Sequence, residues 1–357
     1  MIVPGGIGTG KDNIGVPVLQ GLVKLICTHY DLTIFQLSKP NDDFRAEGFE
    51  LVSVYNPSPF IRLIRFPFIF RGHHKRKKFT SVHGFWGIPA GLLAVVVGKM
   101  SGIKSIVSLL GGDAAGLPQI DYGRLHKPLL RRLTFWTLRN ATHANALTQY
   151  LVNNLKSYGF NGTVEIIPWG VDKDLFDYHP KAPNKEVIFL HVANLHPVKD
   201  QETLLRAFKI ISDNITSKLV IIGSGIDHDK VISTINNLAL SDKVIIKDPV
   251  PYGKLSSFYH NADILLHTSL SEGQSEVVTE AMSCGLVVCG TNVGLIHDLP
   301  GCCVSVEVGD YRALAERTIQ LLNDPGRMNE IRMKAHHWTL QHDITWTARK
   351  LMNLYGS

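Results

Sequence analysis

The chain has 357 residues, of which 45% are hydrophobic and 19% are charged. These are the proportions of a folded globular protein, and the length favours two domains over a single core. A membrane-spanning helix needs roughly 20 consecutive apolar residues. The best candidate, residues 88–97, is far shorter and is followed by Gly98 and Lys99. Composition therefore excludes a disordered protein and a membrane-spanning one.

The net charge of +6 is unevenly distributed. Residues 1–165 hold 19 Lys and Arg against 9 Asp and Glu, whereas the remainder holds 18 against 22. Basicity that is confined to one half of a chain favours a local acidic partner for that half.

The cysteines and the first residues of the sequence give an expectation for the cellular compartment of the protein. The five cysteines are Cys27, Cys284, Cys289, Cys302 and Cys303, and they form neither a CxxC pair nor a metal-binding spacing. Such usage is typical of a reducing compartment. Residues 1–3 already read as a strand, with no signal peptide before them. We therefore expect a cytoplasmic protein.

A glycine-rich loop follows this first strand. The spacing of Gly5, Gly10 and Lys11 imitates a P-loop, but Asp12 stands where a magnesium-binding Ser or Thr is required. We therefore reject a P-loop. The loop is either a flexible turn or a backbone segment that approaches a ligand.

Residues 59–78 combine apolar, aromatic and basic side chains. The basic ones are Arg62, Arg65, Arg71, Lys75, Arg76, Lys77 and Lys78, and the aromatic ones include Phe60, Phe66, Phe68 and Phe70. Two interpretations are open: a segment lying on anionic lipid, or a surface helix packed on its domain with a solvated basic tail. No motif for binding nucleic acid is present, so we expect no nucleic-acid partner.

Strands and helices alternate through both halves, which predicts an α/β protein with two Rossmann-like domains facing a cleft. In the first half, His83 ends a predicted strand and Asp113 lies in a loop after another. Asp113 is the better candidate for a polar group in the cleft, because His83 is equally consistent with a buried core histidine.

The second half begins with a strand over residues 186–192, and Asn194 and Lys199 follow it. From the residues alone, Lys199 could simply cap a helix that starts at Gln201. Further along, Asp227 and Asp229 spell a D-x-D metal motif, but they lie at a helix start, where the helix dipole favours Asp. We expect no metal site there.

Residues 262–294 carry the most informative pattern. An apolar run at 264–266 predicts a buried strand, and a polar loop at 268–275 precedes helical spacing up to Gly285, where a C-cap belongs. Parallel sheets bind ligands at the carboxyl ends of their strands. With Ser275 as N-cap, the helix start would face an anion such as a diphosphate. Glu272 and Glu280 could accept hydrogen bonds from sugar hydroxyls on either side of it.

The E-x7-E spacing of Glu272 and Glu280, with the adjoining Gly273 and the sequence leading to Gly285, resembles the donor site of retaining GT-B glycosyltransferases of family 4. The resemblance covers nearly the whole chain and includes residues 168–172, which are similar to the interdomain linker of that family. It implies an N-terminal acceptor-side domain at 1–168, a nucleotide-sugar domain at 169–340, and a C-terminal helix at 341–357 that returns to the first domain.

The resemblance also implies site residues. The first glutamate of the family pattern contacts the donor sugar and the second binds the ribose. The cation at the position of Lys199 neutralises the diphosphate. Donor contacts are expected from Gly6, Asn194, Lys199, Val250, Glu272, Gly273, Gln274, Ser275 and Glu280, and the catalytic candidates are Glu272, Lys199, Asp113 and His83. Two positions depart from the family: Asn194 replaces an arginine, and Gly111 replaces the histidine of the cleft.

The expected function is a metal-independent, retaining transfer of a sugar from a UDP- or GDP-sugar. The acceptor would be lipid-linked or a glycan, in cell-envelope or polysaccharide synthesis. No cofactor is expected. The protein would be cytoplasmic, either free or peripherally bound to the inner face of the membrane. The alternatives are a sugar-nucleotide epimerase of the same fold and a non-catalytic relative that binds nucleotides. A phosphorylase would need a pyridoxal-binding lysine, which we do not identify.

Overall fold

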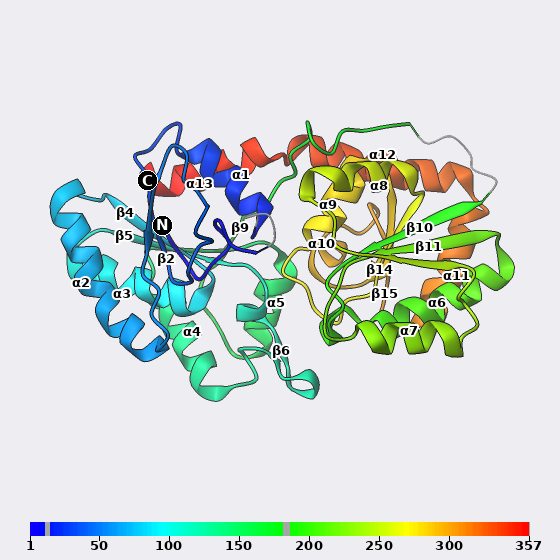
Figure 1. Cartoon of the computed structure of the whole chain (residues 1–357), viewed down its shortest axis with the longest axis horizontal. Helices are drawn as coiled ribbons and strands as arrows, with labels where there is room; N and C mark the ends of the chain where they lie inside the picture. The colour runs from blue at the N-terminus through cyan, green and yellow to red at the C-terminus, as the bar shows by residue number, and fades with distance from the viewer. Residues whose placement is uncertain (11–14, 181–185, 357) are drawn as a thin grey trace. The chain divides into compact units, whose positions relative to one another are not determined.

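The computed structural model describes residues 1–10, 15–180 and 186–356. The chain forms two compact units (Figure 1). Met1–Trp169 together with Ile344–Ser357 make the N-terminal domain, and Gly170–Asp343 make the C-terminal domain. Each contains a parallel sheet with helices packed against it. The predicted α/β class with two Rossmann-like domains is confirmed.

The sheet of the N-terminal domain has the strand order β3-β2-β1-β4-β5-β8-β9 and is parallel throughout. Its strands are β1 (Ile2–Val3), β2 (Thr33–Gln36), β3 (Glu50–Ser53), β4 (Ser81–Phe85), β5 (Lys104–Leu109), β8 (His143–Ala146) and β9 (Glu165–Ile166). The helices are α1 (Pro17–Ile26), α2 (Pro59–Lys77), α3 (Leu92–Ser101), α4 (Pro128–Asn140) and α5 (Gln149–Ser157). A separate two-stranded sheet is formed by β6 (Gly116–Leu117), which pairs antiparallel with β7 (Tyr122–Gly123). The order of strands reverses at β1, which lies between β2 and β4.

The sheet of the C-terminal domain has the order β12-β11-β10-β13-β14-β15 and is also parallel. Its strands are β10 (Val187–Val192), β11 (Ser217–Ile222), β12 (Val244–Lys247), β13 (Ile264–His267), β14 (Val287–Thr291) and β15 (Val304–Val306). The helices are α6 (Gln201–Asn214), α7 (His228–Asn237), α8 (Leu255–Asn261), α9 (Glu276–Ser283), α10 (Gly294–Asp298), α11 (Tyr311–Leu322) and α12 (Pro325–Gln341). The reversal here falls between β10 and β13, which is where such sheets bind ligands.

The last helix, α13 (Ile344–Gly356), belongs to the N-terminal domain and packs along α1, as the blue and red helices of Figure 1 show. The two helices approach closely at Gly21, where an added Cβ would lie 2.6 Å from Cδ1 of Ile344. Thr347 donates to the carbonyl of Pro168 over 2.8 Å. The C-terminal helix therefore returns to the first domain, as the resemblance implied.

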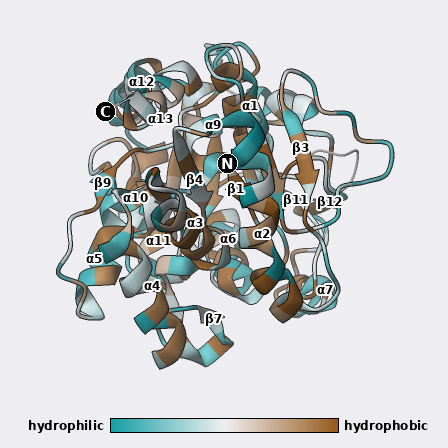
Figure 2. Ribbon diagram, turned by 90° about the vertical axis from the view of Figure 1, so that its left-hand side faces the viewer, coloured by the Kyte–Doolittle hydropathy of each residue, from teal (hydrophilic) through white to brown (hydrophobic). Residues whose placement is uncertain are grey.

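Strands and helices both contribute to the two cores, and both carry hydrophobic colours in Figure 2. In β13, Ile264, Leu265 and Leu266 are fully buried, as expected for a parallel strand that is covered on both faces. None of the helices that the structure describes is both long enough and apolar enough to cross a bilayer. All five cysteines lie within the described residues, and all are free thiols.

Candidate functional site

A pocket of about 300 Å³ opens in the C-terminal domain. Val192 and Ile222, the last residues of β10 and β11, contribute to its wall. The loops beyond the strands add Asn194, Lys199 and Val250, and the start of α9 adds Ser275 and Glu276. The pocket thus lies at the carboxyl edge of the sheet, where open α/β folds bind their ligands.

Glu272 is the centre of a polar cluster in this pocket. Its Oε1 lies 2.5 Å from Nζ of Lys199, accepts from the Ser269 hydroxyl over 2.6 Å, and lies 3.2 Å from Nε2 of His267. Burial alone would raise the pKa of Glu272, but the Lys199 ammonium and the hydrogen bond from His267 outweigh burial and hold the pKa well below its usual range. Glu272 is therefore a carboxylate at neutral pH.

The chain fixes Lys199 at the end of a short turn, Pro197–Lys199. The hydroxyl of Thr268, in the loop after β13, donates to the carbonyls of Lys199 and Asp200 over 3.1 and 3.0 Å. The N-cap of α6 is Asp200, whose carboxylate accepts from the backbone N–H of Thr203. Lys199 therefore does not cap α6. The Lys199 side chain lines the pocket instead.

The start of α9 differs in detail from its prediction. Ser275 is the N-cap, but its side chain makes no capping hydrogen bond, and its φ of 77° lies in the left-handed region, which is uncommon for a residue other than glycine. At the other end, Gly285 has φ 81°, and the backbone N–H of Leu286 donates to Ala281 while that of Gly285 donates to Met282. This is a Schellman motif in which Cys284 is the C-cap and Gly285 is the residue after it, so the helix ends one residue before the predicted cap position.

Glu280 lies deeper than the pocket wall. It is 3% exposed, and its Oε2 accepts a 2.7 Å hydrogen bond from the hydroxyl of Tyr259. Burial raises the pKa of Glu280 to about 7, while the bond from Tyr259 acts in the opposite direction. The carboxyl that reaches the pocket from this helix is that of Glu276, four residues earlier, whose pKa is also raised by burial.

The other donor-binding candidates of this domain divide into two groups. Asn194 and Val250 line the pocket. Gln274 instead supports the loop, because its side chain donates to Thr279 over 3.1 Å and its carbonyl accepts from Leu295. Gly273, which precedes it, is buried.

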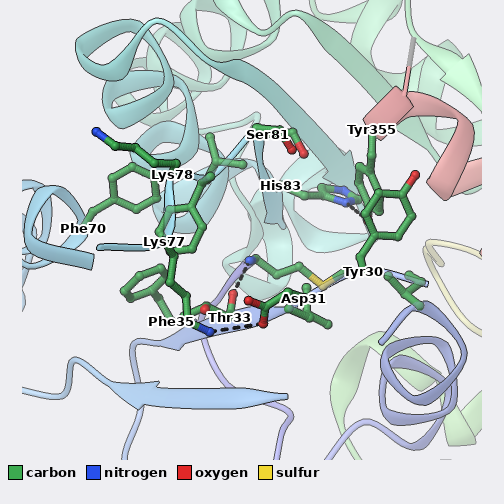
Figure 3. A pocket seen from close by; sticks show the side chains of 16 residues that line it. Tyr30, Asp31, Thr33, Phe35, Phe70, Lys77, Lys78, Ser81, His83 and Tyr355 are labelled. Atoms are coloured by element: carbon green, nitrogen blue, oxygen red, sulfur yellow. Dashed lines mark hydrogen bonds and ion pairs between the residues drawn. The ribbon is translucent and has the colours of Figure 1, made fainter. Parts of the chain in front are cut away.

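His83 lies in the core of the N-terminal domain, and its role as a catalytic group stays a prediction. It is 2% exposed, with Nδ1 2.9 Å from the hydroxyl of Tyr355 and Nε2 2.7 Å from that of Ser108. Burial lowers its pKa to about 3, so the ring is neutral. Figure 3 shows His83 turned toward Tyr355, beside a cavity of about 240 Å³ whose walls include the strand starts Thr33 and Ser81. Both nitrogens are used by the fold.

Asp113 also has a structural role, and its role as a catalytic group stays a prediction. Its carboxylate is 2% exposed and accepts from the backbone N–H of Gly87 and Gly111 over 2.8 Å each, and from that of Leu110 over 3.2 Å. These bonds hold together the loops that follow β4 and β5. A pocket of about 520 Å³ lies on these loops, and Asp113 lines it together with the cations Arg124 and Lys127.

Gly6 lies in the N-terminal domain, in a loop closed by hydrogen bonds from its N–H to the Thr9 hydroxyl and from the Val16 N–H to its carbonyl. Its φ of 99° requires glycine or a strained residue. Lys11 and Asp12, on which the comparison with a P-loop rested, lie outside the described residues.

The segment 59–78 forms α2, and the structure sorts its aromatic residues onto two faces. Phe66 and Phe70 are buried, whereas Phe60 and Phe68 are 71% and 74% exposed. If the segment lies on anionic lipid, Phe60 and Phe68 can therefore meet the lipid, whereas Phe66 and Phe70 cannot. Arg62 is also part of the fold, since it donates to the carbonyl of Leu37 over 2.8 Å.

The sequence analysis did not identify several residues of the site. His267 and Ser269 hold Glu272, Tyr259 holds Glu280, and Glu276 reaches the pocket. His267 offered one signal, because it is a polar residue that ends an apolar strand at the ligand-binding edge. Tyr259 offered none, since its partner lies on a different helix.

Two family descriptions match the chain. Residues 172–338 match Glycosyl transferases group 1, and residues 21–175 match Glycosyltransferase Family 4. Together they cover both domains.

Curated relatives agree with this assignment. The chain is 25% identical over 266 residues to N-acetyl-alpha-D-glucosaminyl L-malate synthase of Bacillus anthracis, an alignment that covers 70% of this chain and 67% of that protein. It is 26% identical over 215 residues to D-inositol 3-phosphate glycosyltransferase of Thermobispora bispora, covering 54% of this chain and 50% of that protein. The chain thus matches about half to two thirds of the length of these relatives.

Among solved structures, HepE of Anabaena in complex with UDP and glucose superposes with a TM-score of 0.77 at 15% identity, covering 100% of this chain and 99% of that one. Identity at this level shows a shared fold. Taken with the two matching family descriptions, the chain belongs to the glycosyltransferases of group 1 and family 4, with the GT-B fold.

Proposed function

We propose that this protein transfers a sugar from a UDP- or GDP-sugar to an acceptor with retention of configuration. The observation that carries the proposal is the pairing of Lys199 with Glu272 in a pocket beside the start of α9. A cation, backbone N–H groups at a helix start and an ionised carboxylate are the groups that a sugar diphosphate requires. Relatives of the same family that are named for glycosyl transfer support it.

The chemistry of the leaving group follows from these charges. As the bond between sugar and diphosphate breaks, negative charge develops on the phosphate, and preorganised donors stabilise that charge best. Lys199 has three N–H donors, of which one reaches Glu272, so the others remain to meet phosphate oxygens. Glu272 would orient the sugar through its hydroxyls. The acceptor attacks on the face that the diphosphate leaves, the phosphate takes its proton, and no general base is assigned.

The acceptor would bind in the N-terminal domain, in the pocket lined by Arg124 and Lys127. Two cations favour an acceptor with an anionic group, such as the phosphate of a lipid-linked acceptor. This would place the protein in cell-envelope or polysaccharide synthesis, in the cytoplasm or at the inner face of the membrane. The exposed part of α2 would supply the contact with that surface.

Incubation with UDP- and GDP-sugars, with and without acceptor extracts, tests the proposal by measuring nucleotide release. Release that depends on the acceptor supports transfer, whereas isomerisation of the sugar nucleotide without an acceptor would support an epimerase. Nucleotide binding without turnover would support a non-catalytic relative. The names of the two relatives compared above describe neither alternative.

The reaction is expected to proceed without a divalent metal. Asp227 is the N-cap of α7 and Asp229 lies in its first turn, so this D-x-D serves a helix start outside the pocket. The initial rate in excess EDTA should equal the rate with magnesium. A rate that requires a divalent ion and is restored by manganese would contradict this expectation.

Glu280→Ala is expected to weaken the binding of UDP or GDP by about 1.5–3 kcal/mol, the range for a hydrogen bond to a charged group. In the family pattern this glutamate binds the ribose. Isothermal titration calorimetry on the folded variant measures the effect.

Glu276→Ala is the matched variant, because Glu276 is the carboxylate of α9 that lines the pocket. If Glu280→Ala binds nucleotide normally and Glu276→Ala does not, the ribose contact belongs to Glu276. Unchanged affinity in both folded variants would remove α9 carboxylates from the nucleotide site.

A further inference from the structure

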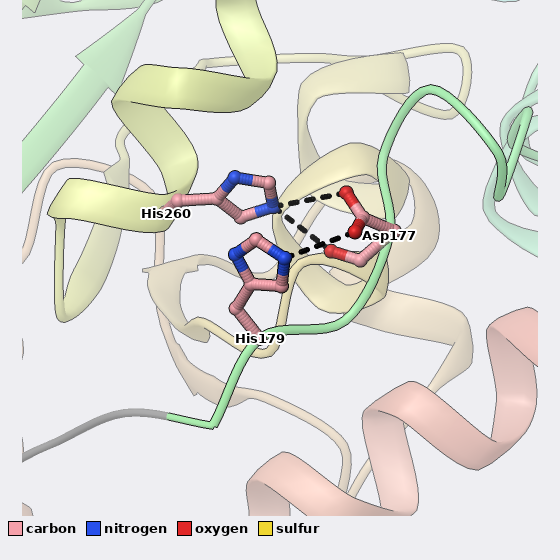
Figure 4. A group of neighbouring side chains, drawn as sticks. All are labelled: Asp177, His179 and His260. Atoms are coloured by element: carbon pink, nitrogen blue, oxygen red, sulfur yellow. Dashed lines mark hydrogen bonds and ion pairs between the residues drawn. The ribbon is translucent and has the colours of Figure 1, made fainter.

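A second polar cluster lies outside the donor pocket, where Asp177, His179 and His260 come together in the C-terminal domain. Nε2 of His179 is 3.0 Å from Oδ2 of Asp177, and Nε2 of His260 is 3.4 Å from Oδ1 of the same carboxylate. The two imidazole rings stack with centroids 3.9 Å apart. Figure 4 shows both rings presenting a nitrogen to the one carboxylate.

We propose that these three side chains form a binding site for a divalent metal of the zinc class. One ligand atom from each residue lies within 4.8 Å of the others. Two ligands at 2.0–2.1 Å from a tetrahedral zinc are roughly 3.4 Å apart, which matches the 3.0 and 3.4 Å separations between nitrogen and oxygen. Two imidazoles and a carboxylate suit zinc and its neighbours, whereas magnesium prefers oxygen ligands.

The segment that carries Asp177 and His179 is held in place by the residue between them. The ring of Tyr178 packs on that of His336 in α12, with centroids 4.4 Å apart. On its other side Tyr178 approaches the backbone of Gly285 so closely that an added Cβ would be 2.7 Å from the ring. The two ligands therefore do not need to be ordered by the metal, which lowers the entropic cost of binding.

The third ligand is equally fixed. His260 lies near the end of α8, next to Tyr259, which is fully buried and bonded to Glu280. Nε2 of His260 also lies 2.9 Å from the carbonyl of Asp177, a contact that a bound metal would replace. Asp177 and His179 have side chains that are 52% and 54% exposed, so water can complete the coordination. The bound metal would tie the segment after Phe176 to α8.

Zinc titration of the purified chain against a chromophoric chelator tests the site directly. The wild type should bind one Zn²⁺, and His179→Ala, His260→Ala and Asp177→Asn should each lower the affinity at least about tenfold, since even outer-shell changes cost 10–100-fold at metal sites. His228→Ala is the matched control, because His228 faces Asp229 at 3.6 Å on the surface of the same domain and no second histidine joins that pair in the described residues.

The melting temperature gives a second readout. Zinc should raise it in the wild type and in His228→Ala but not in the three site variants, and magnesium should leave it unchanged, because a ligand that binds only the folded state stabilises that state. Equal zinc affinity in all variants, or no zinc binding by the wild type, would overturn the proposal. The site lies outside the donor pocket, so we expect the initial rate to be independent of zinc, and failure of either proposal leaves the other intact.

Discussion

Lys199→Met is expected to lower kcat by about 100-fold or more, the loss seen when one preorganised donor to a developing oxyanion is removed. The methionine keeps most of the length of the side chain and removes its charge. The only cation that we find lining the donor pocket among the described residues is Lys199, and the family arginine is replaced by Asn194. Kinetics at saturating donor and acceptor measure the effect.

In Lys199→Met, a loss of folding stability must be distinguished from the loss of catalytic rate. The side chains of Lys199 and Glu272 are 22% and 11% exposed, so removing one charge leaves the other buried and destabilises the domain by about 3 kcal/mol. Lys199→Met combined with Glu272→Gln removes both charges and should recover most of this loss without recovering activity. Urea unfolding of both variants measures it.

Lys218→Met is the control for both measurements. Lys218 pairs with Glu186 at 3.2 Å in the same domain, with side chains 43% and 36% exposed, and such surface pairs contribute little. Its rate and stability should match the wild type. A folded Lys199→Met variant with wild-type kcat would remove Lys199 from the reaction.

Binding of the N-terminal domain to anionic vesicles is the second large effect that we expect, and α2 should carry it. Phe60, Ile61, Ile64 and Phe68 form an exposed apolar stripe on this helix, and Arg71, Lys75 and Arg76 are exposed beyond it. The aromatic rings would enter the headgroup region while the cations meet lipid phosphates. Each cation near an anionic surface contributes about 1 kcal/mol, so replacing Lys75 and Arg76 by Ser should weaken binding about 30-fold.

Flotation with neutral and anionic liposomes, at low and high salt, measures this binding. Phe60→Ser combined with Phe68→Ser should abolish it at both salt concentrations. Ile226→Ser, which removes a 78% exposed side chain from the C-terminal domain, should have no effect. Equal binding to both kinds of vesicle, or binding to neither, would mean that the basic half is a solvated surface and that the acceptor is soluble.

The fold could be predicted from the sequence because its signals are local. The apolar run 264–266, the loop after it and the glycine at 285 define a strand, a ligand-binding loop and a helix end, and the structure has each of them at that place. The face of a helix is harder to assign. In α2 the spacing places Phe66 with Phe70 and Phe60 with Phe68, but only packing on Phe35 decides which pair is inside.

The site was less predictable because its contacts join distant segments. Glu272 and Lys199 lie on separate loops, and their ion pair exists only when β10 and β13 are neighbours. His83 and Asp113 show a second difficulty. A polar residue near a strand end is consistent with a ligand contact, but the structure also gives both residues partners within the fold. These are Ser108 and Tyr355 for His83, and backbone N–H groups for Asp113.

The position of α13 has a consequence for synthesis on the ribosome. Ala348, Leu351 and Leu354 belong to the core of the N-terminal domain, although 174 residues of the other domain, Gly170–Asp343, precede this helix in the chain. The C-terminal domain is continuous and can close its core as it emerges. The N-terminal domain, made first, keeps the face of α1 that receives α13 uncovered until translation reaches Ile344, so the domain that begins the chain is the last to be completed.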